Sequence, residues 1–242
     1  MMRAWADRLL ALLAVCAAGL FVAMWAQFLL GGGVTNVGVD YVLYRDATAR
    51  WLGGGPFYLP HQVSGPYVIA HGDVLYPPPF LILLVPFAVL PAALWWLVPI
   101  AVTGFIVVGY RPHPWAWLAM SICLLFPITG VKILHGNPAL WFGAAIAAGT
   151  RLAWPSVLVL LKPTLLPFAF IGVRRREWWL GLLALAAVSV PFLPMWLDYV
   201  SVLLNGRSEL GLLYSLNEFP MVVIPVIAWI GRRRDADAPP AV

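Results

Sequence analysis

The sequence predicts an all-α, polytopic transmembrane protein of about eight spans, because it is apolar, poor in charge and carries clustered arginines. Hydrophobic residues make up 62% of the 242-residue chain and charged residues only 10%, with a mean hydropathy of +0.89. A water-soluble domain of this size needs far more polar surface. The 13 Trp and 22 Pro agree, since aromatic belts and tolerated helix breaks are features of membrane helices.

The net charge of +5 does not indicate a nucleic-acid partner, because the arginines cluster at the ends of apolar segments, where they orient a membrane protein. Cys16 and Cys123 lie inside apolar runs and are typical of packing residues. His61 and His71 lack the spacing of metal ligands. We therefore expect membrane lipids as neighbours, no nucleic acid, no protein-bound metal and no cofactor.

About eight apolar segments are long enough to be predicted as spans, some of them short and tilted because prolines interrupt them. The predicted spans are residues 9–30, 77–90, 92–110, 115–129, 138–152, 154–173, 178–196 and 219–230. We expect residues 1–231 to form a single transmembrane domain, followed by a disordered cytoplasmic tail over residues 232–242.

Basic residues predict the orientation of these spans. Arg3 and Arg8 precede the first span, and arginine triplets at 174–176 and 232–234 follow two later ones. Because Lys and Arg concentrate in cytoplasmic loops, we expect both termini to be cytoplasmic.

Two long loops are then external, at residues 31–75 and 197–218. Counting the predicted spans along the chain puts Arg111 in an outer turn, against the positive-inside rule, and the polar break 132–137 on the inner side.

The first external loop carries a shorter helical pattern of its own. Tyr41, Tyr44, Thr48 and Trp51 recur at steps of three and four residues, with charged side chains on the other faces. An aromatic stripe opposite a charged face predicts a short helix lying in the membrane interface, which the glycines at 53–55 end.

Acidic residues are concentrated in the predicted external loops. Six of the ten lie there, and none lies in the middle of a predicted span. The six are Asp40, Asp46, Asp73, Asp198, Glu209 and Glu218. A proton relay or cation path normally needs an intramembrane carboxylate, so we expect the chemistry at the external surface.

Asp40 stands at the start of the interfacial helix, where Asp is a favoured N-cap residue. Asp46 lies six residues further along the same helix and is expected to pair with Arg50, four residues on. Asn137, between Gly136 and Pro138, is expected either to bind substrate or to cap the span that follows, and the cap is favoured.

Lys162 is the one charge placed well inside a predicted span. An intramembrane lysine marks function by default, and a compact cation suits a lipid phosphate. The alternative is a side chain that snorkels to the interface. In the last external loop Arg207 is the best phosphate-binding candidate, although a solvated loop is favoured there.

An ordered series of short motifs runs from about residue 38 to residue 180. It comprises Asp40-Tyr41-x-x-Tyr44, Gly54-Gly55-Pro56-Phe57-Tyr58, Tyr76-Pro77-Pro78, Leu90-Pro91, Gly136-Asn137 and Leu161-Lys162-Pro163, then the basic triplet at 174–176. In order and spacing this series resembles the GT-C integral-membrane glycosyltransferases, specifically glycosyltransferase family 87, the polyprenyl-phosphate-mannose-dependent mannosyltransferases. Position 137 holds Asn where the family more often has Gln, and the chain is short for the family.

The resemblance implies transfer of a sugar, mannose in this family, from a polyprenyl-phosphate-linked donor to a lipid or glycan acceptor, with inversion. It implies a site on the outer face of a bacterial plasma membrane. The acidic residue in the first external loop is the family's general base, and Asp40 matches that position. A carboxylate within hydrogen-bond reach of the acceptor hydroxyl can take its proton.

Four further residues are candidates to line the pocket for the sugar and the lipid phosphate. They are Tyr44, Arg45, Tyr58 and Tyr76. For each tyrosine, a place in an interfacial aromatic belt is the alternative.

Two other functions stay open at this point. A chain this short is compatible with a non-catalytic membrane assembly subunit. A small-molecule transporter is the third hypothesis, although it needs polar residues in the middle of facing spans, and only Lys162 qualifies.

Overall fold

The structure is a computed structural model that describes residues 2–30, 36–70, 72–208 and 217–233. Helices make up 76% of it, and within these residues the strands are two short ones that pair in parallel. The all-α prediction is confirmed. The predicted tail at 232–242 lies outside the described residues from position 234 onward.

The elements follow one another in chain order, many of them broken by prolines. They are α1 (Met2–Leu30), α2 (Val39–Leu52), α3 (Pro60–Ser64), β1 (Tyr67–Val68), η1 (Pro78–Phe80), α4 (Leu81–Leu84), η2 (Val85–Ala88), α5 (Ala93–Gly109), α6 (Pro114–Leu125), α7 (Pro127–His135), α8 (Ala139–Leu152), η3 (Trp154–Leu161), η4 (Pro163–Leu165), α9 (Leu166–Ala169), α10 (Arg176–Ser189), η5 (Val190–Phe192), α11 (Leu193–Asn205), β2 (Gly206–Arg207), α13 (Phe219–Val222) and α14 (Ile224–Ile230).

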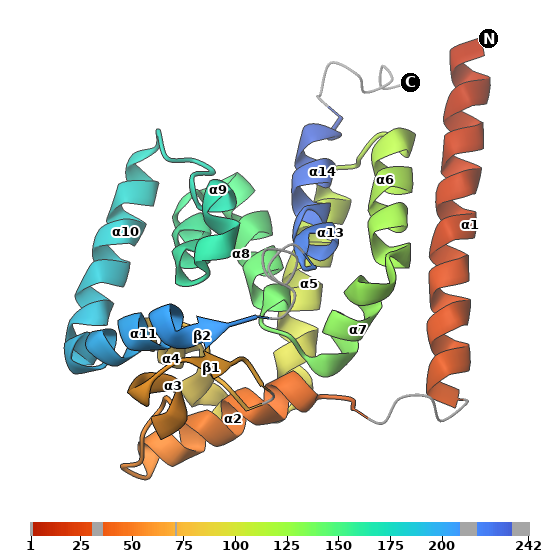
Figure 1. Cartoon of the computed structure of the whole chain (residues 1–242). Helices are drawn as coiled ribbons and strands as arrows, with labels where there is room; N and C mark the ends of the chain where they lie inside the picture. Colours follow the sequence, from red (N-terminus) through yellow and green to blue (C-terminus); the bar gives the residue numbers. More distant parts are fainter. Residues whose placement is uncertain (1, 31–35, 71, 209–216, 234–242) are drawn as a thin grey trace.

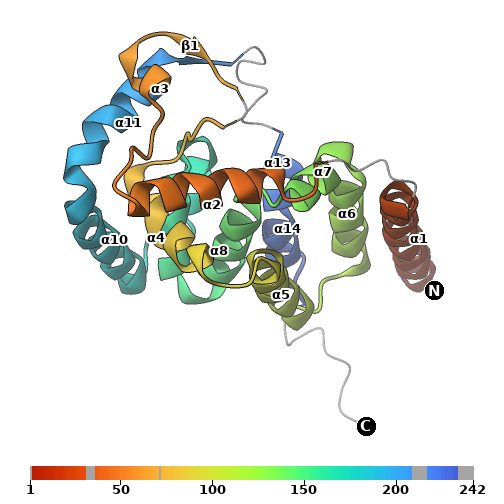
Figure 2. The same ribbon diagram turned by 90° about the horizontal axis from the view of Figure 1, so that it is seen from below.

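The helices form two groups that differ in direction. In Figure 1 α1, α5, α6, α8, α10 and α14 stand roughly upright, while α2, α3, α11 and the strands lie across their lower ends. Figure 2 views this transverse layer from below and shows α2 running across the ends of the upright helices. The first predicted external loop therefore folds into a layer on one end of the bundle, and α11 makes the start of the second predicted loop helical.

Helix α2 forms where the aromatic stripe predicts it. Tyr41, Tyr44 and Thr48 are buried, and Gly53 ends the helix. Its start differs from the prediction for Asp40. The N-cap residue is Gly38 in a left-handed conformation (φ 76°), Asp40 lies in the first turn, and no side chain caps the helix.

Residues 78–88 do not form the predicted span. Prolines divide this stretch into η1, α4 and η2, because a proline removes a backbone donor and disfavours the regular helix before it. The stretch is bent by 115° against α5 and packs on α2. The chain therefore stays near the transverse layer until α5 begins.

The bend changes the side of the next turn. The backbone N–H of His113 donates to the carbonyl of Gly231 at 2.8 Å, which places the α5–α6 turn beside the end of α14. In Figure 1 this turn lies at the same end as the start of α1 and the α9–α10 connection. Arg111 therefore lies at the same end as residues 174–176 and Arg232, which contradicts the predicted placement of this turn opposite the arginine triplets.

The segment at 154–173 also departs from the predicted single crossing. Its prolines divide it into η3, η4 and the four-residue α9. The guanidinium of Arg175 donates to the carbonyl of Arg151 at 2.8 Å, so the segment returns to the end of the bundle where it began. Lys162, at its midpoint, lies deep in the molecule between η3 and η4.

Judged by length and composition, fewer helices could cross a membrane than the sequence predicted. Among the described residues, Trp5–Gln27 and Arg176–Asn205 are each long and apolar enough to cross a membrane. The count rises to four if Pro78–Ala88 with Ala93–Gly109, and Pro114–Leu125 with Pro127–His135, are each one bent span. About eight spans are therefore not shown.

Exposed apolar side chains cover the outer helices. On α1 the side chains of Val15 and Leu20 are 69% and 60% exposed, and on α10 that of Leu183 is 66% exposed. Such faces are costly in water and suit hydrocarbon. The aromatic core lies under α2, where Trp95 is fully buried and its indole donates to the carbonyl of Gly136 at 2.7 Å.

We predict that Ser64 and Arg111 lie on opposite sides of the membrane. Single-cysteine variants Ser64→Cys and Arg111→Cys, built in a background with Cys16 and Cys123 changed to Ala, test this with an impermeant maleimide. In intact cells only Ser64→Cys should react, because Arg111 shares the arginine-rich end. A Glu177→Cys variant is the control for that end, and reaction of both Ser64→Cys and Arg111→Cys in intact cells would contradict the prediction.

Candidate functional site

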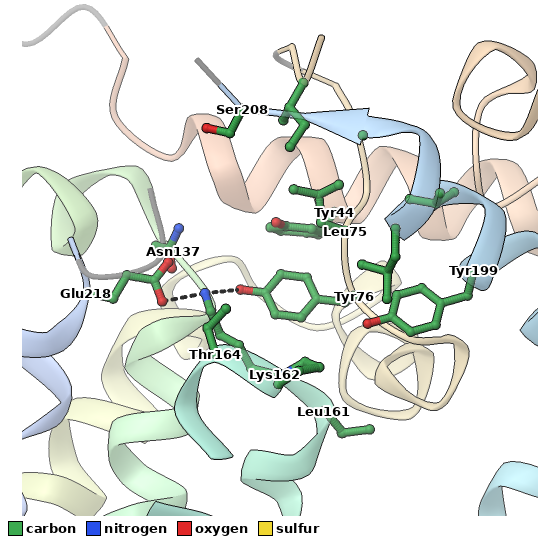
Figure 3. Close-up of a pocket in the computed structure, with 15 residues that line it drawn as sticks. Tyr44, Leu75, Tyr76, Asn137, Leu161, Lys162, Thr164, Tyr199, Ser208 and Glu218 are labelled. Atoms are coloured by element: carbon green, nitrogen blue, oxygen red, sulfur yellow. Dashed lines mark hydrogen bonds and ion pairs between the residues drawn. The ribbon is translucent and has the colours of Figure 1, made fainter. Parts of the chain in front are cut away.

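A pocket of about 380 Å³ opens between the transverse layer and the ends of the upright helices. Its walls come from α2, the segment before η1, the η3–η4 junction, α11, β2 and the start of α13. Figure 3 shows the polar side chains that face it. It is lined by Tyr44, Ile69, Leu75, Tyr76, Asn137, Leu161, Lys162, Pro163, Thr164, Tyr199, Val202, Leu203, Gly206, Ser208 and Glu218.

Lys162 supplies a positive charge inside this pocket. Its side chain is only 14% exposed, and its ammonium forms an ion pair with Glu218 and donates to the hydroxyl of Tyr76 at 3.1 Å (Figure 3). The ammonium also lies 5.2 Å from the centre of the Tyr76 ring. The lysine is therefore held in the pocket and does not snorkel away from it.

Glu218 lies between two lysines. Its side chain is 6% exposed, its Oε2 contacts Lys162, and its Oε1 lies 3.9 Å from the ammonium of Lys132 on α7. A buried carboxylate requires such partners, because an uncompensated charge in the interior is strongly destabilising. Sequence reasoning grouped Glu218 with a solvated loop, but the structure makes it part of the site.

Tyr76 forms one wall of the pocket and is fixed by aromatic packing. Its ring stacks on Phe80 with centroids 4.2 Å apart and meets the edge of Tyr44 at 5.4 Å. The hydroxyl of Tyr58 donates to the backbone carbonyl of Tyr76 at 2.8 Å. Burial raises the pKa of Tyr58, so this hydroxyl stays protonated and keeps the bond. Tyr58 thus supports the wall but does not line the pocket.

Asp40 and Asn137 meet although 97 positions separate them. The amide of Asn137 donates to Asp40 Oδ2 at 2.6 Å, and its Oδ1 accepts the backbone N–H of Ala139 at 3.0 Å. A backbone N–H needs an acceptor, so the second contact orients the amide with its donor toward Asp40. Asn137 lines the pocket, whereas Asp40 is not among the lining residues and lies beside the pocket through this hydrogen bond.

The position of Asn137 corrects the predicted topology. The break 132–137 was placed at the inner end with the arginines, but its last residue contacts α2 in the transverse layer. The bend before α5 explains the difference, because one fewer crossing reverses the side of every later loop up to α8. Asn137 accepts the backbone N–H of Ala139 at the start of α8, as a capping residue does, and it lines the pocket, whereas substrate binding by Asn137 stays a prediction.

Four charged residues of the transverse layer lie away from the pocket lining. Arg45 and Asp46 pair with each other on the exposed face at 2.9 Å, so the predicted pairing of Asp46 with Arg50 was wrong. Arg50 instead donates to the carbonyls of Pro56 and Phe57 and holds the glycine turn. Arg207 is exposed on β2, and its neighbours Gly206 and Ser208 reach the pocket instead.

A second polar pair lies in the transverse layer, outside the pocket. The ring Nε2 of His61 lies 2.8 Å from Asp73 Oδ1, and Asp73 Oδ2 accepts the backbone N–H of Ala70 at 2.7 Å. Asp73 is buried whereas His61 is about half exposed. These contacts tie the segment that follows β1 to α3, and they account for the carboxylate of Asp73 structurally.

Four polar residues of the pocket were not among the predicted site residues, and for Glu218 a solvated loop was favoured. The four are Thr164, Tyr199, Ser208 and Glu218. The last three lie beyond the motif series, and no spacing connects them to Asp40. The available signal was chemical: Lys162 inside an apolar segment needs a counter-ion, and Glu218 stands directly before the last apolar segment.

Comparisons with protein-family models, with characterised proteins and with solved structures give no match.

We predict that Gly136→Ala destabilises the fold and separates Asn137 from Asp40. Gly136 has φ 69°, and a Cβ there would lie 2.6 Å from the Trp96 ring and 3.0 Å from Tyr41 Cβ. Strain of this kind costs about 1–3 kcal/mol. Thermal unfolding in detergent measures the loss.

The matched control is Gly143→Ala on α8, where a Cβ would meet nothing within 4 Å. That variant should be as stable as the parent or slightly more so, since alanine favours helix. Equal melting temperatures for Gly136→Ala and the parent would contradict the prediction.

Proposed function

We propose that the chain is a membrane glycosyltransferase of the GT-C type, resembling family 87. It moves a sugar, mannose by that resemblance, from a polyprenyl-phosphate donor to a lipid or glycan acceptor. The observation that carries the proposal is the meeting of Asp40 and Asn137 at the edge of a pocket that also holds Lys162. The residues come from three separate motifs of the series, and each offers one part of the required chemistry.

Asp40 acts as the general base of the proposed reaction. The acceptor hydroxyl attacks the anomeric carbon and loses its proton to the free side of the Asp40 carboxylate, with inversion. Asn137 donates to Asp40 Oδ2 and orients the carboxylate, which leaves Oδ1 for the acceptor. Asp40 is half-buried, so an acceptor can reach it from the pocket edge.

Lys162 binds the phosphate of the donor. As the sugar leaves, the electron pair of the broken bond stays on the phosphate oxygen, and a positioned ammonium stabilises the growing charge. Tyr44 and Tyr76 supply flat faces beside the pocket for the sugar or the first part of the lipid. Arg45 and Arg207 lie outside the lining and are at most peripheral contacts.

The proposed orientation places this pocket outside. The arginine-rich ends of α5, α9 and α14 face the cytoplasm by the positive-inside rule, and the transverse layer lies at the opposite end. Helix α2 then lies in the outer interface, where a lipid-linked donor can enter from the bilayer.

The decisive prediction concerns Asp40→Asn and Asp40→Ala. Loss of the base lowers sugar transfer by about 10²–10⁴-fold in both variants, measured with purified protein and a lipid-phosphate-linked sugar. Asp40→Asn keeps an acceptor for the Asn137 amide and should unfold near the parent's temperature, whereas Asp40→Ala loses that hydrogen bond and should be less stable. Asp40→Glu should also be slow, because a misplacement of about 1 Å can cost 10²-fold.

Asp46→Asn is the matched control, since it removes a carboxylate from the exposed face of the same helix. It should keep full activity. An Asp40→Asn protein that inserts normally and transfers sugar at the parental rate would remove Asp40 from the mechanism. A purified parent without any transfer activity would favour a non-catalytic assembly subunit.

Lys162→Met is predicted to weaken use of the donor more than use of the acceptor. Loss of one charge-assisted contact to phosphate costs on the order of 1.5–3 kcal/mol, or roughly 10–100-fold in apparent donor affinity. Lys162→Arg should rescue only in part, because a planar fork does not replace a point charge. An unchanged apparent affinity for the donor in Lys162→Met would remove Lys162 from donor binding.

A further inference from the structure

The charges around Glu218 do not cancel, and one of them, Lys132, lies next to Glu218 but outside the pocket lining. Glu218 carries one negative charge and lies between two ammonium groups. That of Lys132 is 3.9 Å from Oε1, and that of Lys162 contacts Oε2. All three side chains are largely buried, with 18%, 14% and 6% of Lys132, Lys162 and Glu218 exposed. This three-residue cluster therefore has one positive charge in excess.

An excess charge in a partly dry pocket favours an anionic ligand, because pairing offsets the cost of removing the charge from water. The geometry leaves a donor for such a ligand. An ammonium has three N–H groups, and within the described residues Lys162 directs them to Glu218 and to the hydroxyl of Tyr76. The third N–H group is directed at neither Glu218 nor Tyr76. Lys162 lines the pocket beside Thr164 and Asn137 (Figure 3).

Glu218 limits how much negative charge the ligand can carry. A singly charged anion neutralises the cluster, whereas a doubly charged one leaves an unmatched negative charge beside a carboxylate. Like charges in such a site cost free energy and are a common device for rejecting the wrong ligand. A phosphodiester carries one negative charge, and a phosphomonoester carries about 1.5–2 at pH 7.

We propose that Lys132, Lys162 and Glu218 form an anion site that selects a phosphodiester over a phosphomonoester, with Glu218 as the specificity-determining residue. The biological role of this selectivity rests on the proposed function. A lipid-linked sugar donor is a phosphodiester, and the lipid phosphate left after transfer is a monoester.

The selectivity then favours product release. In the transfer step the acceptor oxygen forms a bond to the anomeric carbon, and the bond from that carbon to the phosphate oxygen breaks. The electron pair stays on the phosphate and the acceptor proton goes to Asp40. The phosphate thereby gains negative charge next to Glu218, so the spent lipid binds less tightly than the donor.

The test needs no knowledge of the natural sugar. Binding of methyl decyl phosphate, a diester, and of decyl phosphate, a monoester, is measured by calorimetry with the full chain in a non-ionic polyoxyethylene detergent at pH 8. The parent should bind the diester at least about tenfold more tightly, as expected from one additional like charge in the site. Equal binding, or tighter binding of the monoester, would overturn the proposal.

Glu218→Gln should remove this preference by tightening monoester binding about tenfold, and Glu218→Asp should retain it. The control is Glu177→Gln, an exposed carboxylate paired with Arg175 at 3.3 Å at the other end of the bundle, which should leave both affinities unchanged. A folded Glu218→Gln protein with the parent's ratio of affinities would also overturn the proposal. If that variant does not fold, the ratio in the parent decides.

The outcomes separate this inference from the proposed function. Diester selectivity without any sugar transfer would reject the transferase and keep the anion site. Sugar transfer by a parent that binds both phosphates equally would keep the transferase and reject the selective anion site.

Discussion

The structure depends on the burial of the Lys162 ammonium. Moving an isolated ammonium into an apolar interior costs several kcal/mol even after relaxation, so it requires partners that come from elsewhere in the chain. Glu218 and the Tyr76 hydroxyl provide them. These contacts join the η3–η4 junction to the start of α13 and to the segment before η1, which are far apart in sequence. The pocket exists because these three elements converge on one charge.

Prolines make that convergence possible. A continuous helix over residues 154–173 would carry Lys162 past the pocket in a regular crossing. Short 3₁₀ segments instead take the chain inward and return it to the end where Arg151 and Arg175 are hydrogen-bonded. The same effect before α5 keeps residues 78–88 near the transverse layer, and there Tyr76 and Phe80 can pack beneath α2.

The two charged groups of the site have different supports, which suits different tasks. Asp40 is half-buried and is oriented by one amide, so it remains open to a substrate hydroxyl. Lys162 is enclosed and held by an opposite charge, which favours recognition of an anion over proton transfer. In the proposed enzyme the first group activates the acceptor and the second holds the donor, with Asn137 lining the space between them.

The sequence by itself determined the class and the local patterns. Apolarity and arginine clusters predict a helical membrane protein, and the spacing of Tyr41, Tyr44 and Thr48 predicts α2 and its buried face. Those signals are local, since helix periodicity and charge are read over a few turns. Lys162 also stood out, because a charge within an apolar run is conspicuous without any knowledge of its partners.

Only the tertiary structure decided which segments bend back, at which end of the bundle each turn lies and which residues meet. A proline break has the same appearance in sequence whether the chain continues across or bends back. Packing against α2, which comes from elsewhere in the chain, decides for the 115° bend. The sides of Arg111 and Asn137 follow from that one bend. The pairing of Asp40 with Asn137, and of Lys162 with Glu218, joins residues 97 and 56 positions apart, and no local pattern encodes such long-range contacts.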